Sequence, residues 1–129
     1  MYVLIRTDIL LADQIVQVGH ACLDAGSSFH QPDQKSNLVL LSVANEKHLL
    51  DSVDRIEAAG IRCVVFHEPD DEMGYTAACT EPVAGIQRRR FQKFQLWRSE
   101  DAIGDARPPP LPAFFRPFAG SARMSWPSA

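Results

Sequence analysis

The chain has 129 residues, of which 46% are hydrophobic and 22% are charged, and its formal net charge is −3 at pH 7. This length predicts one domain with its own core, and the composition is typical of a globular protein. The small negative charge excludes an overall attraction to nucleic acid or to an anionic membrane. Any anionic partner must therefore meet a locally basic region.

The cysteines and the N-terminal residues bear on the compartment. Cys22, Cys63 and Cys79 have no CxxC spacing, and each lies in an apolar run. We therefore expect reduced thiols, no metal site and a cytoplasmic protein. The first residues lack a signal-peptide pattern, and no run of about 18 to 20 apolar residues is present, so we expect no membrane partner.

In chain order, residues 2–8 predict an apolar strand. The next residues predict a helix that begins after Asp8, as late as Ala12, and ends near Gly26. Asp8 is a candidate cap for this helix. One helical face is expected to be apolar and to pack on the core: Leu11, Ile15, Val18, Cys22, Ala25 and Phe29. The opposite face is expected to be polar: Asp13, Gln17, His20 and Asp24.

After a polar loop, strand and helix signals alternate. A strand at 38–44, a helix at 46–59 capped by Asn45, and a strand at 61–67 predict a right-handed parallel crossover. An acidic turn at 68–74 leads to a fourth strand at 75–83. Residues 84–97 predict a short basic segment that is helical or irregular.

These elements predict an α/β domain over residues 1–97, with a four-stranded, mostly parallel mixed sheet and helices on both faces. Residues 98–129 form a Pro-rich extension with six of the nine prolines, which excludes a helix or a central strand there. The extension is expected to be either disordered or extended as polyproline over a surface. Its aromatic residues favour docking on this chain or on a neighbouring subunit: Phe114, Phe115, Phe118 and Trp126. We therefore expect a homo-oligomer, with a dimer as the first hypothesis.

The polar face of the first helix carries candidate chemistry. Gln17 and His20 lie three residues apart and are neighbours on a helix surface. An imidazole there suits a general base toward water, with Asp24 orienting the ring. The alternative is an ordinary solvated helix face.

The turn after the third strand carries a second group of candidates. Glu68 follows that strand directly, where α/β sheets gather ligands, so it is a candidate catalytic or ribose-binding carboxylate. Thr76 offers a hydroxyl to a substrate carbonyl or sugar, and Gly74 offers a backbone N–H to an oxyanion or phosphate. The alternatives are a solvated acidic turn, a plain strand threonine and a plain turn glycine.

Basic residues gather near the end of the domain. Five of the 13 basic residues lie within eleven positions: Arg88, Arg89, Arg90, Lys93 and Arg98. Their mixture with Phe91, Phe94 and Trp97 is typical of surfaces that bind phosphates and bases. The alternative is a solvated basic flank whose aromatic residues point into the core.

Taken together, these motifs resemble the type 2 peptidyl-tRNA hydrolases, best known from archaea and eukaryotes, over roughly residues 2–97. Arg6-Thr7-Asp8 is similar to the family's Arg-x-Asp at the end of the first strand. Gln17-Val18-Gly19-His20-Ala21 is similar to its Gln-x-x-His-Ala. A helix with an early Glu46 and a Gly-containing turn into a Thr-bearing strand follow in the same order.

The resemblance implies a divergent, bacterial-like member that hydrolyses the ester between a peptide and the 3′ ribose of tRNA, with tRNA or peptidyl-tRNA as partner and no cofactor or metal. It implies that His20 or Glu68 activates water, while Thr76 and backbone N–H groups hold the carbonyl. The residues expected to bind substrate are Gln17, Asp13, Gly74, Arg88, Arg89 and Arg90. Asp13 stands where the family has a lysine, and Glu68-Pro69-Asp70 replaces its Asp-Ala-Gly-x-Thr.

Two other functions stay open. One is a non-catalytic or differently specific relative that binds a protein or a ligand, with the Pro-rich extension mediating assembly. The other is hydrolysis of a different ester or amide, with no nucleic acid involved.

Overall fold

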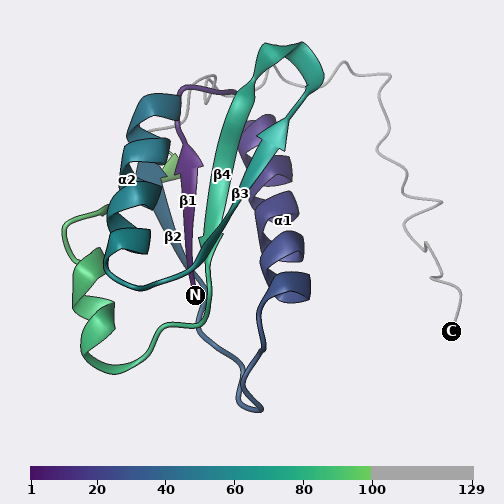
Figure 1. Cartoon of the computed structure of the whole chain (residues 1–129). Coiled ribbons are helices and arrows are strands. Elements are labelled where there is room, and N and C mark those ends of the chain that lie inside the picture. The colour runs from purple at the N-terminus through teal and green to yellow at the C-terminus, as the bar shows by residue number, and fades with distance from the viewer. Residues whose placement is uncertain (100–129) are drawn as a thin grey trace, which may run out of the picture.

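A computed structural model describes residues 1–99 of the chain. Its elements occur in the order β1 (Tyr2–Arg6), α1 (Leu11–Ser28), β2 (Val39–Val43), α2 (Glu46–Ala58), β3 (Cys63–Glu68), the 3-10 turn η1 (Asp70–Glu72), β4 (Gly74–Thr80), the 3-10 helix η2 (Gly85–Phe91) and β5 (Gln95–Leu96). The fold is α/β, with one mixed sheet between two helices (Figure 1).

The sheet has five strands in the order β3-β4-β1-β2-β5. Only β1 and β2 pair in parallel, and the other three pairs are antiparallel. The prediction of a four-stranded, mostly parallel sheet is therefore wrong. Residues 69–73 connect β3 to β4, and so short a link permits only an antiparallel hairpin. The added strand, β5, lies in the segment that was expected to be helical or irregular.

The crossover through α2 joins two strands that do not pair. β2 and β3 run in the same direction, but β1 and β4 lie between them. The parallel pair is formed instead by β1 and β2, which are connected through α1. The sheet therefore has β1 at its centre, and all of β1 from Tyr2 to Ile5 is buried.

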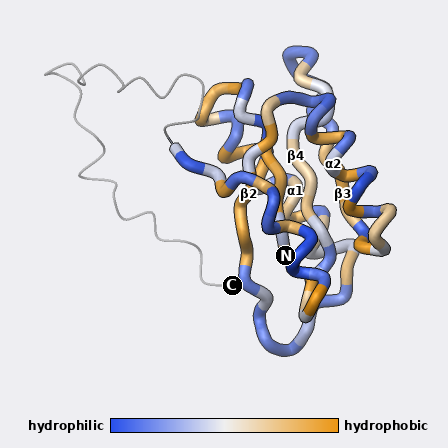
Figure 2. The backbone as a smooth tube through the Cα atoms, turned by 90° about the vertical axis from the view of Figure 1, so that its left-hand side faces the viewer, coloured by the Kyte–Doolittle hydropathy of each residue, from blue (hydrophilic) through white to orange (hydrophobic). Residues whose placement is uncertain are grey.

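Each face of the sheet has its own core, as predicted for helices on both faces (Figure 1). On the α2 face, the core contains Leu4, Leu41, Val43, Leu49, Val53 and Ile56. On the α1 face, it contains Val3, Ile5, Ala21, Ala25, Ala77 and Cys79. The hydrophilic link between α1 and β2 lies at the bottom of Figure 2, away from both cores.

The predicted orientation of α1 is only partly right: Ala25 is buried and Val18 and Cys22 pack against the core, but the buried face is shifted toward the glutamines. Gln14 and Gln17 are buried against the sheet, whereas Ile15 and Leu23 are 65% and 73% exposed. Small residues at Ala21 and Ala25 bring the helix close to the sheet, and the glutamine amides reach sheet and loop partners. The face of α1 that carries the hydrogen-bonded amides of Gln14 and Gln17 is buried, and the more apolar face that carries Ile15 and Leu23 is exposed.

The ends of α1 also differ from the prediction. The helix continues past Gly26 to Ser28, and its N-cap is Leu10, which makes no capping hydrogen bond with its side chain. Asp8 does not cap the helix, because its carboxylate is paired with Arg6. Likewise, β4 ends at Thr80 rather than at residue 83.

Candidate functional site

A bulge in β4 turns Thr76 toward α1. Phe66 pairs with Ala77 and His67 pairs with Tyr75, so Thr76 is an extra residue in β4. Ala78 belongs to the α2-side core, and strict alternation would place Thr76 on that same face. The bulge breaks the alternation, and the Thr76 hydroxyl instead donates to Gln17 of α1.

Gln17 joins α1 to both strands of the hairpin. Its Oε1 accepts a hydrogen bond from Thr76 Oγ1 at 2.7 Å, and its Nε2 donates to Glu68 Oε2 at 3.0 Å. An ionised carboxylate only accepts, so Glu68 must face the NH₂ group, which fixes the orientation of the amide. Gln17 is 3% exposed, and Thr76 is fully buried. Thr76 therefore positions Gln17, and Gln17 positions Glu68.

Glu68 is held in its ionised form. The hydrogen bond from Gln17 and a second one from the Asp70 backbone N–H lower the pKa of the Glu68 carboxyl, and the nearby positive forms of His20 and His67 lower it further. Its side chain lies at the C-terminal end of β3 and is partly exposed. Glu68 is therefore an accessible, oriented anion.

His20 lies one turn after Gln17 on α1. Its ring is exposed and stacks on Phe66 of β3, with ring centroids 4.4 Å apart and an interplanar angle of 6°. This contact holds the imidazole flat against the outer strand, on the same side of the sheet as Glu68. The structure thus brings Gln17, Glu68 and Thr76 together, with His20 beside them.

Arg6 clamps the hairpin that carries this site. Its guanidinium donates from Nε to Asp8 Oδ1 at 2.8 Å and from Nη2 to Oδ2 at 2.9 Å. Its Nη1 donates to the backbone carbonyls of Met73 and Tyr75. The sequence predicts Arg6 and Asp8 as a motif and Asp8 as a helix cap, but not their joint role in fixing the start of β4.

Gly74 is favoured by its left-handed backbone conformation. It has φ +72°, and an added Cβ would collide with the carboxylate of Glu46 at the start of α2. Glu46 Oε2 accepts a hydrogen bond from the Tyr75 N–H at 2.8 Å. The Glu46 carboxylate therefore lies where a side chain at residue 74 would be, and the binding of an oxyanion or phosphate by the Gly74 N–H stays a prediction.

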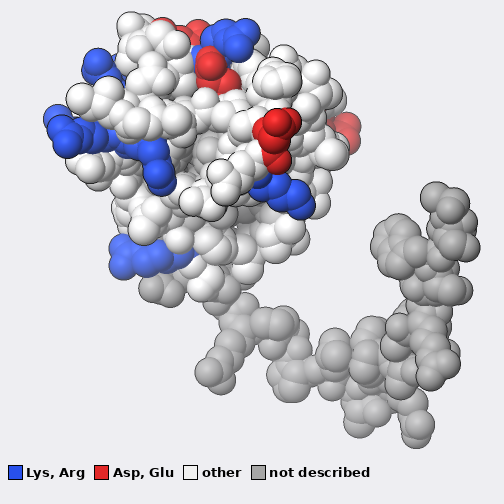
Figure 3. Space-filling view, turned by 90° about the horizontal axis from the view of Figure 1, so that it is seen from below, with Lys and Arg blue, Asp and Glu red and all other residues white. Residues whose placement is uncertain are grey.

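The other predicted binding residues lie apart from this group. Asp13 is half-buried in the first turn of α1, one turn before Gln17. Arg88, Arg89 and Arg90 are exposed on η2, whose Phe91 packs in the α2-side core. In the view from below, blue basic atoms gather on the left, which is the α2 and η2 side of Figure 1 (Figure 3).

The described residues also bear on the predictions about metal ions and membranes. Within residues 1–99, no three His, Cys, Asp or Glu side chains are placed to hold a metal ion, and no helix is long and apolar enough to cross a membrane. The three thiols are free. The predicted docking of the extension falls on residues 100–129, which lie outside the described part of the chain.

Comparison with known proteins adds no relative. No protein-family model matches the chain, and no curated protein matches it by sequence. Inference about function therefore rests on the residues and their geometry.

Proposed function

We propose that this chain is a divergent relative of the type 2 peptidyl-tRNA hydrolases and hydrolyses an ester, with the peptide–ribose ester of a tRNA-like substrate as the first candidate. The observation that carries the proposal is the Thr76–Gln17–Glu68 hydrogen-bond chain. These three residues lie far apart in sequence and occupy the positions that the resemblance singles out. His20, at the fourth such position, is exposed beside them.

His20 is the better general base of the two candidates. The lowered pKa of Glu68 makes that carboxylate a weak proton acceptor, whereas the exposed imidazole of His20 presents a ring nitrogen to solvent that can accept a proton. In the proposed reaction His20 takes a proton from water, the oxygen attacks the ester carbonyl, and the imidazolium returns the proton to the leaving ribose oxygen. Glu68, held by Gln17, stabilises the positive ring. Thr76 acts through Gln17 as a positioning residue.

The test is release of free tRNA from a peptidyl-tRNA by the full chain. His20→Ala is expected to abolish turnover, and Glu68→Gln to reduce it with the fold intact. His30→Ala is the matched control, because His30 is exposed in the loop after α1. Unchanged turnover in His20→Ala, or none in the unmodified protein, would contradict the proposal.

Salt dependence tests the nucleic-acid part separately. A tRNA complex should weaken steeply with added salt, and neutralising Arg88, Arg89 and Arg90 should flatten that slope. Hydrolysis without such a slope would leave an esterase that acts on another ester. We also propose a cytoplasmic location, because three free thiols fit a reducing compartment. The homodimer stays a prediction, to be checked by light scattering.

A ligand-binding module is the second candidate function. A basic cleft between α2 and the segment around η2, on the face of the sheet opposite α1, favours this function.

A further inference from the structure

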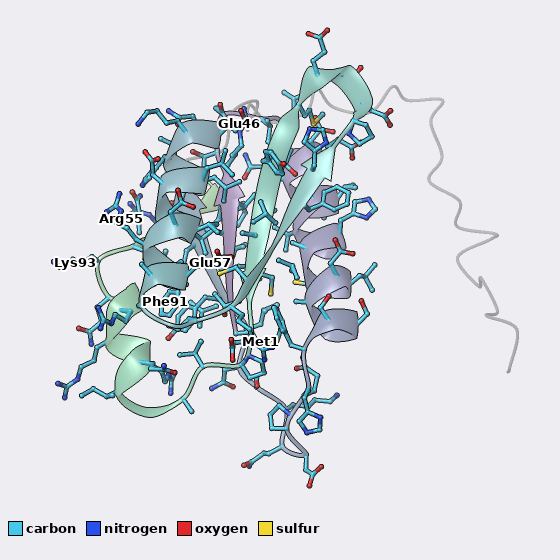
Figure 4. All side chains as sticks on the ribbon, in the orientation of Figure 1. Met1, Glu46, Arg55, Glu57, Phe91 and Lys93 are labelled. Carbon is cyan, nitrogen blue, oxygen red and sulfur yellow. The ribbon has the colours of Figure 1, made fainter. Side chains whose placement is uncertain are left out.

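A cleft of about 470 Å³ lies between α2 and the segment around η2. The polar side chains that line it are His48, Ser52, Arg55, Arg89, Arg90 and Lys93. The α2 residues recur at spacings of four and three and so form a straight stripe on the helix. Arg55 and Lys93 extend from the same side of the molecule (Figure 4).

Four positively charged, exposed side chains line the cleft, and no acidic side chain does. Within residues 1–99, the ion pairs are Arg6–Asp8, Lys47–Asp51 and Arg62–Glu81, and none of them involves the four cations of the cleft. Like charges held around one hollow repel each other and focus a positive potential in it. A polyanion would relieve this repulsion.

Ser52 gives a second, independent indication of a ligand. Its side chain is 1% exposed and lines the cleft, and its Oγ is the buried side-chain polar atom without a hydrogen-bond partner among residues 1–99. Buried hydroxyls in folded proteins are nearly always paired. An anion in the cleft would supply the missing acceptor.

His48 adds a directed donor. Its Nδ1 accepts a hydrogen bond from the Ala44 N–H at 2.9 Å, which leaves the proton of the neutral ring on Nε2. His48, Lys93 and Phe94 are shared with an adjoining hollow of about 490 Å³ that reaches Thr7 and Ser42. The two hollows thus form a continuous groove that ends at the carboxyl ends of β1 and β2.

The walls of the cleft also include apolar side chains. Ile56 and Ala59 of α2 and the half-buried ring of Phe94 line it beside the cations. Its volume lies in the range of small-ligand sites, roughly 300–1,000 Å³. A ligand with a phosphate group and a flat or apolar body matches both kinds of lining.

We propose that this cleft binds nucleotide phosphates, with the phosphate held by Arg55, Arg89, Arg90 and Lys93 and the base placed against Phe94. The nucleotide comes either free or within a single-stranded nucleic acid, and both present the same chemistry. The inference shares Arg89 and Arg90 with the proposed tRNA contact but does not rest on the proposed ester hydrolysis, because α1 with Gln17 covers the opposite face of the sheet.

Calorimetric titration of the full chain with ADP at about 50 mM salt tests the site. Arg89→Glu with Arg90→Glu should weaken binding by about tenfold or more. Arg88→Glu is the matched control, because Arg88 belongs to the same basic run but lines other hollows, beside Tyr2 and Val39. Ser52→Ala should weaken binding by a few-fold without loss of thermal stability, since it removes an unpaired buried hydroxyl.

A single-stranded eight-residue oligonucleotide in competition with ADP separates the two sources. Displacement of ADP at lower concentration than free nucleotides require identifies a nucleic-acid strand, and failure to displace it identifies a free nucleotide. Absence of binding by both probes would overturn the proposal. The double variant changes the net charge by four and Arg88→Glu by two, so an increase in log Kd in the double variant no larger than twice the increase in Arg88→Glu would also overturn the proposal, since that outcome reflects general charge alone.

Discussion

The two helices pack on the sheet through different chemistry. α2 contributes Leu49, Val53 and Ile56 to an apolar interface. α1 contributes only the small Ala21 and Ala25 to the buried core of its face, with the buried amides of Gln14 and Gln17 beside them. The α2 interface is therefore stabilised mainly by burial of large apolar side chains. The α1 interface combines smaller apolar contacts, including the half-buried Val18 and Cys22, with directed hydrogen bonds.

Magnitudes show why α1 keeps this orientation. Burying Ile15 and Leu23 would contribute about 3–6 kcal/mol together. If α1 rotated, the hydrogen-bond partners of the two glutamines would lose their bonds, including the buried Thr76 hydroxyl and the half-buried Trp97 indole N–H. Each loss would cost about 1–3 kcal/mol of stability. The opposing terms are similar in size. The hydrogen bonds to Gln14 and Gln17 therefore offset the apolar burial that the observed rotation gives up, and together with the packing of Val18 and Cys22 they account for it.

The largest expected effect comes from truncating a leucine on α2. Leu49→Ala should lower the free energy of unfolding by about 2–5 kcal/mol, because Leu49 is fully buried. The same substitution on α1, Leu23→Ala, should change it by less than about 0.5 kcal/mol. Urea unfolding of both variants measures the difference. Equal losses of unfolding free energy in the two variants would mean that Leu23 on the outer face of α1 is buried against another part of the protein or a partner.

A smaller effect is expected from the amide. Gln17→Ala should cost about 1–3 kcal/mol, because the buried Thr76 hydroxyl loses its acceptor. In Thr76→Val the hydroxyl is absent, so adding Gln17→Ala should cost much less in that background. Additive losses in this double-mutant cycle would show that the two side chains are not coupled.

The pH dependence of stability sharpens the contrast further. The pKa of Glu68 is lowered in the folded protein by Gln17 and the Asp70 N–H, so its stabilising contribution is present above the unfolded value of about 4.3. It is lost as the pH falls through the lower folded pKa. Glu68→Gln should therefore flatten the acid limb of stability against pH. Asp51→Asn is the α2-side comparison, because Lys47 lowers the pKa of Asp51. If the stability of Glu68→Gln depended on acid pH in the same way as that of the unmodified protein, Glu68 would not be the group whose lowered pKa stabilises the fold.

The smallest effect is expected in the rate of thiol alkylation. Slow alkylation would show that water does not enter the interfaces of the sheet with α1 and α2. Burial raises the pKa to about 12 for Cys63, beside the α2-side core, and to about 12 for Cys79, in the α1-side core. At pH 8 the thiolate fraction is then about 10⁻⁴, so alkylation should be slow at both until the protein unfolds. Rapid labelling of Cys79 alone would show that water enters the α1 interface. Mass spectrometry of the labelled peptides reads this directly.

The elements were predictable from the sequence where local signals are strong. Apolar spacing and Asn45 placed α2 almost to the residue, and the Asn45 side chain does cap it. The β3–β4 hairpin is implied by the short link between the two predicted strands, but the parallel crossover pattern predicted a mostly parallel sheet, and the positive φ of Asp71 and Glu72 leaves no sequence signal beyond Gly74.

The candidate site was predictable as residue types but not as an arrangement. Hydropathy treats Gln17 as a surface residue, since it takes no account of partners such as Thr76 and Glu68. A resemblance drew attention to all three, yet their contacts depend on helix rotation and on a bulge. Neither feature leaves a periodic trace in the sequence.

The extra residue at Thr76 makes this arrangement depend on the number of residues in β4. Deleting one residue there would let Tyr75 and Ala77 follow each other in regular alternation, and the hairpin would still close. Gln17 would then lose its hydroxyl donor in a single genetic event, while the sheet survived. In a set of homologous chains, the length of this hairpin would therefore separate those that keep the site from those that keep only the scaffold.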